Sequence, residues 1–354
     1  NIARWMQEEF PVRHAHQLME YYRLPYMMLM CPQFAEVHDR QLNTFHVLSG
    51  VRRISSGEDI ESFAATLRTE FKGGSDTIQL LRSGIAELRK YISVEDMQPL
   101  QRFLDKFVVT RIGNRVLAEN FVNWLDCARE GRPDVTLSTG TIQECRLAPL
   151  IRGEVDSVCG LADQIYGHSP AVEIDDSSDT EVLVIPSHLQ FITREMLKNA
   201  IYATMESESS WSSWCPPPVH IAIRPGKYDV EIKISDQGGG MRRRDLRRVW
   251  EYGFSGDKGD DLSMPSQDEK NISRKQLGGY GIGVPLSRLF ARYFGGDLSY
   301  SSMYGYGTDV HIRLNRIGDQ VELGSSPDEH DEDRDHRYKQ EKDEHGKALP
   351  NRGE

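Results

Sequence analysis

The chain has 354 residues, 38% hydrophobic and 27% charged, a composition that suits a globular protein long enough for two domains. About half of its formal charge of −11 lies in residues 319–354, so the remainder is close to neutral and gives no indication of nucleic-acid binding. No stretch approaches the ~18 apolar residues of a membrane span, and five cysteines without a CxxC spacing argue against structural zinc or a disulfide framework.

The first half of the chain is predicted to be helical. Apolar residues recur at intervals of three and four over most of it, which is the period of a helix with one buried face. Pro25, Pro32 and the stretch 131–140 interrupt this pattern and mark the connections between helices. We therefore expect a four-helix bundle from about residue 10 to 165, with its last helix near 149–166.

The second half changes to short alternating runs that predict strands. These runs lie at 180–185, 219–224, 230–235, 297–302 and 308–314. Helical stretches at 187–206 and 284–294 separate them, so we expect strands with helices on one face, a two-layer α/β sandwich. The polar segment 255–277 is predicted to be a long mobile loop, of a length that is usually functional or disordered.

These patterns together predict three regions. Residues 1–166 form the helical domain and residues 167–317 the α/β domain. The charged segment 318–354 has almost no large apolar residues, and we expect an acidic disordered tail there.

The predicted helix 187–206 carries a polar face beside its apolar one. Glu195, Asn199, Tyr202 and Glu206 follow helical spacing. One interpretation is a solvated stripe, the commoner fate of such residues. The other is functional: a carboxylate base lies one turn from an amide oxygen, a neutral ligand that suits Mg²⁺ together with phosphate oxygens.

Three glycine-containing segments add to this helix. The sequence DQGGG places Asp236 at the end of a strand, where glycines let a ligand approach the backbone or simply form a turn. The sequence LGGYGIGVPLSRLF at 277–290 puts glycines before a helix, whose exposed amides can bind phosphate. In GYGTDV, Thr308 opens the last strand, where its hydroxyl either reaches a buried carboxylate or is an ordinary strand residue.

In this order, the four segments resemble the ATP-binding fold shared by histidine kinases, type II topoisomerases, mismatch-repair ATPases and clamp-type heat-shock chaperones. The resemblance implies that Asp236 accepts a hydrogen bond from the adenine amine and that Asn199 is a ligand of Mg²⁺, with K⁺ as a further candidate ion. The remaining nucleotide contacts that it implies are Tyr202, Ala203, Glu206, Gly238, Gly240, Ser255, Gly279, Tyr280, Gly281, Ile282, Gly283, Val284 and Thr308.

A narrower resemblance is to the mitochondrial protein kinases that act on pyruvate and branched-chain 2-oxoacid dehydrogenases. The segments EMLKNAIYATMES at 195–207 and GYGTDV at 305–310 carry it, together with FPVRHAHQL at 10–18 and FLDKFVVTRIGNRVLAENF at 103–121. It implies a homodimeric serine kinase of the mitochondrial matrix, with Glu195 as catalytic base. Its substrate would be the decarboxylase α subunit, pyruvate dehydrogenase before the branched-chain complex, and its docking site the lipoyl domain of the acyltransferase core.

Three positions depart from the pattern of that family. Phe191 stands where the pyruvate branch has a histidine, and Tyr202 and Gln237 stand where the family has arginines. Two other functions therefore stay open: an ATP-gated clamp ATPase or chaperone, and a scaffold that binds ATP without kinase activity. A histidine kinase with His14 or His16 as phosphoacceptor is disfavoured, because the acidic residue expected after the acceptor is missing.

Overall fold

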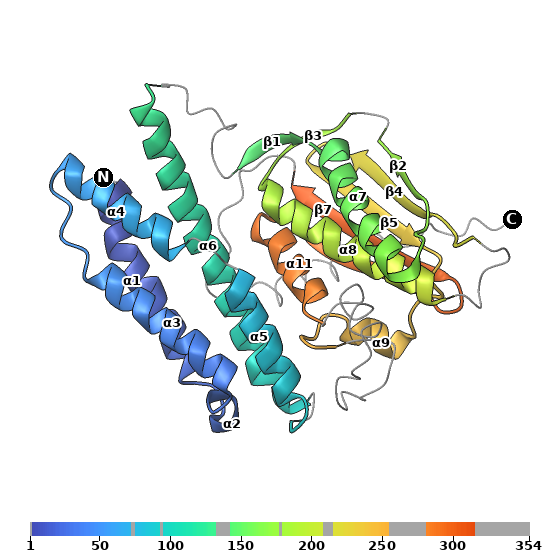
Figure 1. Ribbon diagram of the computed structural model, residues 1–354, viewed down its shortest axis with the longest axis horizontal. Coiled ribbons are helices and arrows are strands. Elements are labelled where there is room, and N and C mark those ends of the chain that lie inside the picture. Colours follow the sequence, from blue (N-terminus) through green and yellow to red (C-terminus); the bar gives the residue numbers. More distant parts are fainter. Residues whose placement is uncertain are drawn as a thin grey trace, which may run out of the picture.

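The computed structural model describes residues 2–71, 75–92, 95–131, 142–176, 179–207, 215–254 and 281–315 (Figure 1). The predicted loop at 255–277 and the predicted tail at 318–354 lie outside these ranges. Among the described residues, no helix is both long and apolar enough to cross a membrane.

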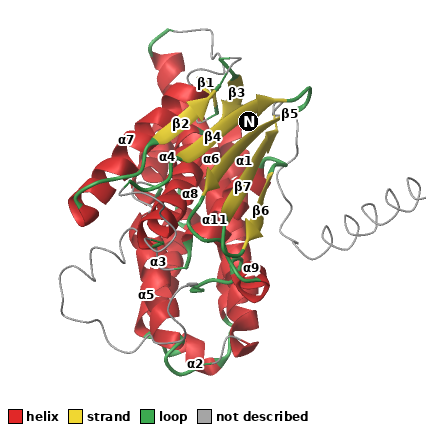
Figure 2. Ribbon diagram, turned by 90° about the vertical axis from the view of Figure 1, so that its right-hand side faces the viewer, coloured by secondary structure: helices red, strands yellow, loops and turns green. Residues whose placement is uncertain are grey.

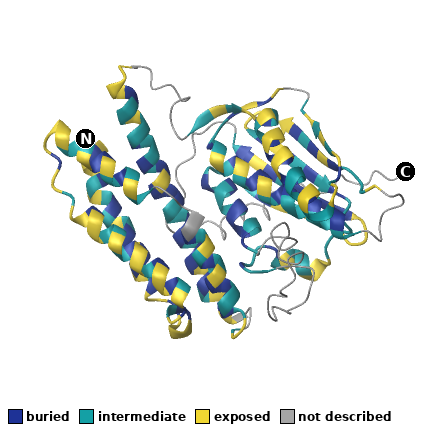
Figure 3. Cartoon of the chain, viewed as in Figure 1, coloured by how far each residue is buried: buried dark blue, intermediate teal, exposed yellow. Residues whose placement is uncertain are grey.

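The N-terminal half is helical, as predicted. Its elements are α1 (Ile2–Tyr21), α2 (Tyr26–Leu29), α3 (Pro32–Ser49), α4 (Gly57–Glu70), α5 (Ser75–Leu88), the 3₁₀ turn η1 (Glu95–Met97) and α6 (Gln98–Arg129). Helix α3 packs against α1 and α5, and α6 packs against α1 and α4. Figure 3 shows buried and exposed residues mixed along these helices, as expected for helices that each bury one apolar stripe.

The helix that we expected to complete the bundle lies elsewhere. Helix α7 (Leu147–Tyr166) packs against α8 (Pro186–Glu206) and shares a hydrophobic cluster with it and with the sheet. The reason is its apolar stripe, whose members Leu147, Ile151, Val158 and Ala162 are buried in that cluster. The predicted domain boundary at residue 166 stays a prediction.

The α/β part is a five-stranded sheet with helices on one face, which confirms the predicted fold class (Figure 2). The strand order is β2 (Val172–Asp175), β4 (Val219–Pro225), β5 (Asp229–Asp236), β7 (Gly307–Asn315) and β6 (Asp297–Met303). Strand β2 is parallel to β4 and the other pairs are antiparallel. Inward residues of β5 such as Val230 and Ile232 are fully buried, while Glu231 between them in the strand is exposed.

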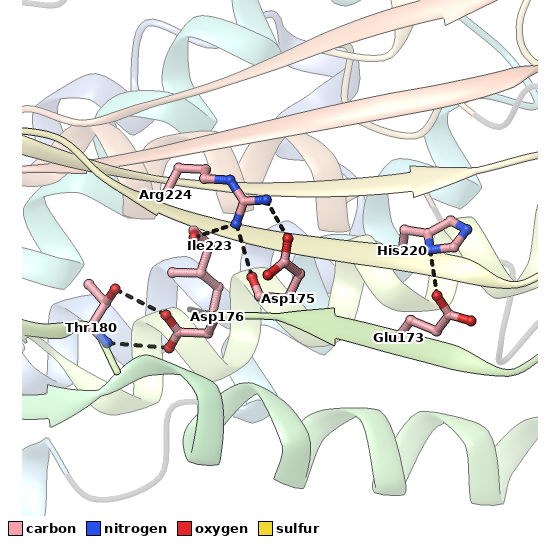
Figure 4. A network of polar contacts seen from close by, with 7 residues as sticks. All are labelled: Glu173, Asp175, Asp176, Thr180, His220, Ile223 and Arg224. Atoms are coloured by element: carbon pink, nitrogen blue, oxygen red, sulfur yellow. Dashed lines mark hydrogen bonds and ion pairs between the residues drawn. The ribbon is translucent and has the colours of Figure 1, made fainter. Parts of the chain in front are cut away.

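Three strands differ from the prediction, since β1 (Gln143–Arg146) and β2 were not expected and β3 pairs outside the main sheet. The expected strand at 180–185 forms β3 (Glu181–Val184), which pairs with β1 (Gln143–Arg146) in a separate two-stranded sheet. The strand β2 was not predicted, because four residues with partial burial give too short an alternating pattern. At this edge Arg224 pairs with Asp175 and His220 with Glu173, so side chains reinforce the β2–β4 pairing (Figure 4).

The two halves share one hydrophobic cluster. Residues of α5 and α6 pack with Tyr252, Ile282 and Leu286 from the α/β part. The Tyr252 hydroxyl donates a hydrogen bond to Oδ1 of Asp105 on α6 at 2.8 Å. Burial, reinforced by Asp105, raises the pKa of Tyr252 well above its ordinary value, so the phenol stays a donor.

This contact predicts that the two halves lose stability together when the hydroxyl is removed. For Tyr252→Phe we expect a loss of about 1.5–3 kcal/mol in the free energy of unfolding, the usual value of a hydrogen bond to a charged group. The measurement is the urea midpoint at constant m-value. The exposed Tyr228→Phe is the matched control and should leave the midpoint unchanged. An equal midpoint for both variants would contradict the prediction.

Candidate functional site

Helix α8 presents two faces to its surroundings. Leu189, Ile192, Met196 and Ala200 are buried against the sheet, as their spacing predicts. Glu195 and the residues that follow it at helical spacing are only partly buried and lie along the other side. The apolar residues of α8 fix the helix against the sheet. The polar residues lie along its other side and are therefore held in a fixed position.

Glu195 lies against the beginning of helix α11 (Gly283–Tyr293). Nζ of Lys198 donates a hydrogen bond to Oε1 of Glu195 at 2.9 Å, and both side chains are only 16% exposed. The second oxygen, Oε2, faces Gly283 so closely that a methyl group there would overlap it. The carboxylate is therefore held at a helix N-terminus, where negative charge is favoured.

Asp236 is the last residue of β5, and the turn that follows it lies on α8 at Ala203. It is 7% exposed and stands opposite Thr308 of β7 in the strand register. The amide of Gly238 donates to its Oδ1 at 2.8 Å. Burial raises the pKa of Asp236 to about 6, and the hydrogen bonds from the amides of Gly238 and Thr308 oppose that rise.

The glycines after Asp236 permit close packing on two sides. A methyl group at Gly238 would overlap Ala203 and Thr204 of α8, so the turn lies directly on that helix. Gly240 has φ +63° and lies against the carbonyl oxygen of Met303 at the end of β6. No other residue type fits both positions, since one lacks space and the other needs a left-handed backbone.

The segment before α11 joins the site to the helical half. Gly281 has φ +71°, and its carbonyl accepts a hydrogen bond from Gly253 at 2.7 Å. Ile282 is buried in the cluster shared with α5 and α6, whereas Val284 packs against the sheet cluster. The helix begins between two hydrophobic cores, so its N-terminus is held on both sides.

The predicted residues fall into three groups. Those on neighbouring segments around α8 are Glu195, Asn199, Ala203, Asp236, Gly238, Gly240, Gly283 and Thr308. Glu206 is bound instead by the Tyr166 hydroxyl of α7 at 2.8 Å, and Tyr202 packs partly against the sheet cluster. Ser255, Gly279 and Tyr280 lie outside the described residues.

Two neighbours of this site were not predicted. Lys198 stands three residues after Glu195, a spacing that brings side chains together on a helix and was the available signal. Tyr300 of β6 reaches the site from the sheet and contacts Met196. Tyr300 was indicated less clearly, because a tyrosine in a predicted strand does not show which residue of the helical layer it contacts.

The donor groups of the site suit a nucleotide with Mg²⁺. Asn199 carries a neutral amide oxygen one turn of α8 after Glu195, and the Glu195 carboxylate lies at the beginning of α11. Mg²⁺ takes one or two protein oxygens together with phosphate oxygens and water. The amides of the first helical turn suit the phosphates themselves.

Comparisons with known proteins agree with both halves of this structure. Residues 1–143 match the family model described as mitochondrial branched-chain alpha-ketoacid dehydrogenase kinase, and residues 185–317 match the histidine kinase-, DNA gyrase B- and HSP90-like ATPase model. Three relatives are mitochondrial [pyruvate dehydrogenase (acetyl-transferring)] kinases. The Arabidopsis thaliana enzyme is 29% identical (90% of this chain, 86% of the relative). Human isozyme 1 is 29% identical (90% and 74%), and Ictidomys tridecemlineatus isozyme 4 is 30% identical (89% and 76%).

The buried Asp236 predicts a specific dependence of stability on pH. Because its folded-state pKa of about 6 exceeds the ordinary 3.8, the unfolded chain releases this proton first as the pH rises. Relative to Asp236→Asn, the wild-type protein should therefore lose about 2 kcal/mol of unfolding free energy between pH 4 and pH 7. Urea unfolding of both proteins across this range measures the difference. Parallel profiles would show that the carboxyl titrates normally.

Proposed function

This chain belongs to the family of the mitochondrial pyruvate dehydrogenase kinases, and from that premise we propose that it phosphorylates a serine of a 2-oxoacid dehydrogenase complex. The phosphate donor is ATP, and the acceptor is the decarboxylase α subunit, of pyruvate dehydrogenase first and of the branched-chain complex second. The observation that carries this proposal is the carboxylate of Glu195 beside the first residue of α11.

Glu195 acts as the catalytic base. Lys198 holds Oε1 and so fixes the orientation of the carboxylate, while Oε2 points to the N-terminus of α11. With the γ-phosphate held at that N-terminus, the serine oxygen would attack its phosphorus from the side of Glu195 and the hydroxyl proton would pass to Oε2. The bond from this phosphorus to the bridging oxygen would break, with ADP as the leaving group. The same geometry would activate water in an ATPase, so the choice of acceptor depends on what docks beside the site.

Asp236 recognises the adenine. One of its oxygens accepts the amide hydrogen of Gly238, and the other accepts the exocyclic amine of the base. Above pH 6 the carboxylate is mainly ionised, which makes it an acceptor without a competing proton. The glycine turn that follows packs on α8 and leaves no side chain over the base.

The phosphates bind to the amides at the beginning of α11, with Asn199 as the protein ligand of Mg²⁺ and K⁺ as a further candidate. When bound, Mg²⁺ neutralises charge on the phosphate oxygens. Gly281, Ile282, Gly283 and Val284 set the path of the backbone before and within the first turn. Gly279, Tyr280 and Ser255 complete the nucleotide set in this proposal.

The departure at Phe191 is a packing substitution in this structure. Its ring lies edge-on to Phe290 of α11 at 5.2 Å between centroids, and it joins the cluster shared with the helical half. In the pyruvate branch, the histidine at this position is a proposed partner that adjusts the basicity of the glutamate. In this chain Phe191 makes an apolar contact between α8 and α11 in its place. In this chain the orientation of Glu195 depends on Lys198 instead.

The remaining assignments follow from the family. The helical region within 1–166 docks to the lipoyl domain of the acyltransferase core and carries regulation, and residues 167–317 bind ATP. The chain forms a homodimer in the mitochondrial matrix. Residues 318–354 are an acidic tail outside these two regions.

The decisive experiment measures transfer of labelled γ-phosphate to purified pyruvate and branched-chain decarboxylases. We expect serine labelling of an α subunit, faster for the pyruvate enzyme. Glu195→Gln should lower the rate by a factor of about 100 or more, as expected for loss of a general base, while ATP affinity changes less than about threefold. Glu181→Gln on β3 is the control with the same chemical change away from the site.

Three other results would overturn the proposal. ATP turnover without labelled protein would indicate a clamp ATPase, and ATP binding without turnover a scaffold. Labelling of a histidine of the chain itself would indicate a histidine kinase.

A further inference from the structure

A row of three polar residues crosses the sheet where β5 ends. Thr308 of β7 stands opposite Asp236 of β5, and Ser302 of β6 stands opposite Thr308. These strands are neighbours in the sheet (Figure 2). Ile232 and Ile234 precede Asp236 at alternate positions and are buried in the cluster between sheet and helices. Because residues opposite each other share a face of the sheet, the whole row lies on the side of the helices.

The Ser302 hydroxyl joins the turn after β5 to strand β7. Its oxygen accepts a hydrogen bond from the backbone N–H of Met241 at 2.7 Å. The same oxygen lies 3.0 Å from the hydroxyl of Thr308 and 3.3 Å from the carbonyl oxygen of Gly307. A serine hydroxyl has one hydrogen and two lone pairs, so it can make these contacts together. Ser302 is therefore bonded to both segments at once.

Backbone hydrogen bonds tie the same turn to the hairpin between β6 and β7. The amide of Gly239 donates to the carbonyl oxygen of Tyr306 at 3.2 Å, and the amide of Gly305 donates to the carbonyl oxygen of Gly239 at 2.8 Å. These bonds do not depend on side chains, whereas the bond from Met241 to Ser302 does. A substitution at Ser302 can thus loosen one end of the turn and leave the backbone contacts in place.

The position of this turn determines how the Asp236 carboxylate is presented. Its Oδ1 accepts a hydrogen bond from the amide of Gly238 at 2.8 Å, so a displacement of the turn would rotate the carboxylate or break this bond. Gly240 lies so close to the carbonyl oxygen of Met303 that a methyl group would overlap it. Ser302, the residue before Met303, holds the turn where this close contact is made.

We propose that Ser302 is a positioning residue for recognition of the nucleotide base. Its hydroxyl holds the turn after Asp236 beside Thr308, so that the carboxylate meets an exocyclic amine. This rests on the proposed function, in which Asp236 accepts a hydrogen bond from the adenine amine. Without the hydroxyl, the Met241 amide loses its acceptor and the turn can move away from β6. The bond to the amine is then weakened, while contacts to the rest of the nucleotide are kept.

The test compares two nucleotides in calorimetric titrations of the full chain: ATP, and purine riboside triphosphate, which lacks the exocyclic amine. We expect the wild-type protein to bind ATP about tenfold more tightly or better, since the analogue cannot donate to Asp236. Ser302→Ala should lower the affinity for ATP about fivefold to tenfold, the value of one hydrogen bond, and the affinity for the analogue less than about twofold.

Matched variants show whether the hydroxyl itself is responsible. Ser302→Thr keeps the hydroxyl at a strand position that suits a β-branched residue, and should retain the ATP affinity within about twofold. Ser301→Ala makes the same chemical change on the exposed neighbour, which points to the other face, and should change neither affinity. In the background of Asp236→Ala, Ser302→Ala should have no further effect on ATP binding. Circular dichroism and the urea midpoint establish that each variant is folded.

The outcomes separate the two levels of the proposal. If the wild-type protein binds both nucleotides equally, the role of Asp236 in the proposed function is wrong. If Asp236→Ala abolishes the preference for ATP but Ser302→Ala preserves it, the inference on Ser302 is wrong and the role of Asp236 stands. Equal losses for both nucleotides would assign Ser302 a purely structural role. That result, or a loss in Ser302→Thr as large as in Ser302→Ala, would also overturn the inference.

Discussion

Helix α8 is held between two glycine backbones, and the arrangement of the site depends on that close packing. Gly238, after the sheet strand β5, lies against Ala203, and Gly283, at the beginning of α11, lies against Glu195. At neither glycine is there space for a Cβ atom, so any side chain would push a neighbouring segment away from α8. The Asp236 turn and the beginning of α11 are consequently both packed directly on α8. These glycines are needed chiefly because the missing Cβ lets two segments approach each other closely, and less because of the freedom of their backbone.

The close packing has an energetic consequence at Asp236. To lie beneath the turn, its carboxylate must leave water, and two backbone amides compensate only part of that loss, as its raised pKa shows. A buried acid with incomplete hydrogen bonding is poor for stability, but it is ready to accept a donor from a ligand. The site thus gives up some stability of the free protein for recognition, a trade that is common where binding residues are buried before the ligand arrives.

Much of the fold and part of the site could be predicted from the sequence, and the failures have physical causes. Periodicity identified the helices and four of the five strands of the main sheet, because each buries one face. It could not say which partner covers that face, so α7 was placed in the bundle although it packs on α8. The glycine and acid motifs located Glu195 and Asp236 because such motifs are local in the chain. Tyr300 was missed since its partner Met196 lies about a hundred residues away in the chain, and only the layering of sheet and helix brings them together.

The same layering connects the helical half with the site through packed side chains. Ile282 is buried in the cluster formed with α5 and α6, and the next residue, Gly283, touches the carboxylate of Glu195. Tyr252 adds a hydrogen bond to Asp105 of α6 on the segment that also contacts Gly281. Because packed cores transmit displacement and do not absorb it, a shift of α6 relative to the sheet must move the beginning of α11. The distance between Glu195 and the beginning of α11 is therefore set by the interface of the two halves as well as by the α/β part that carries both groups.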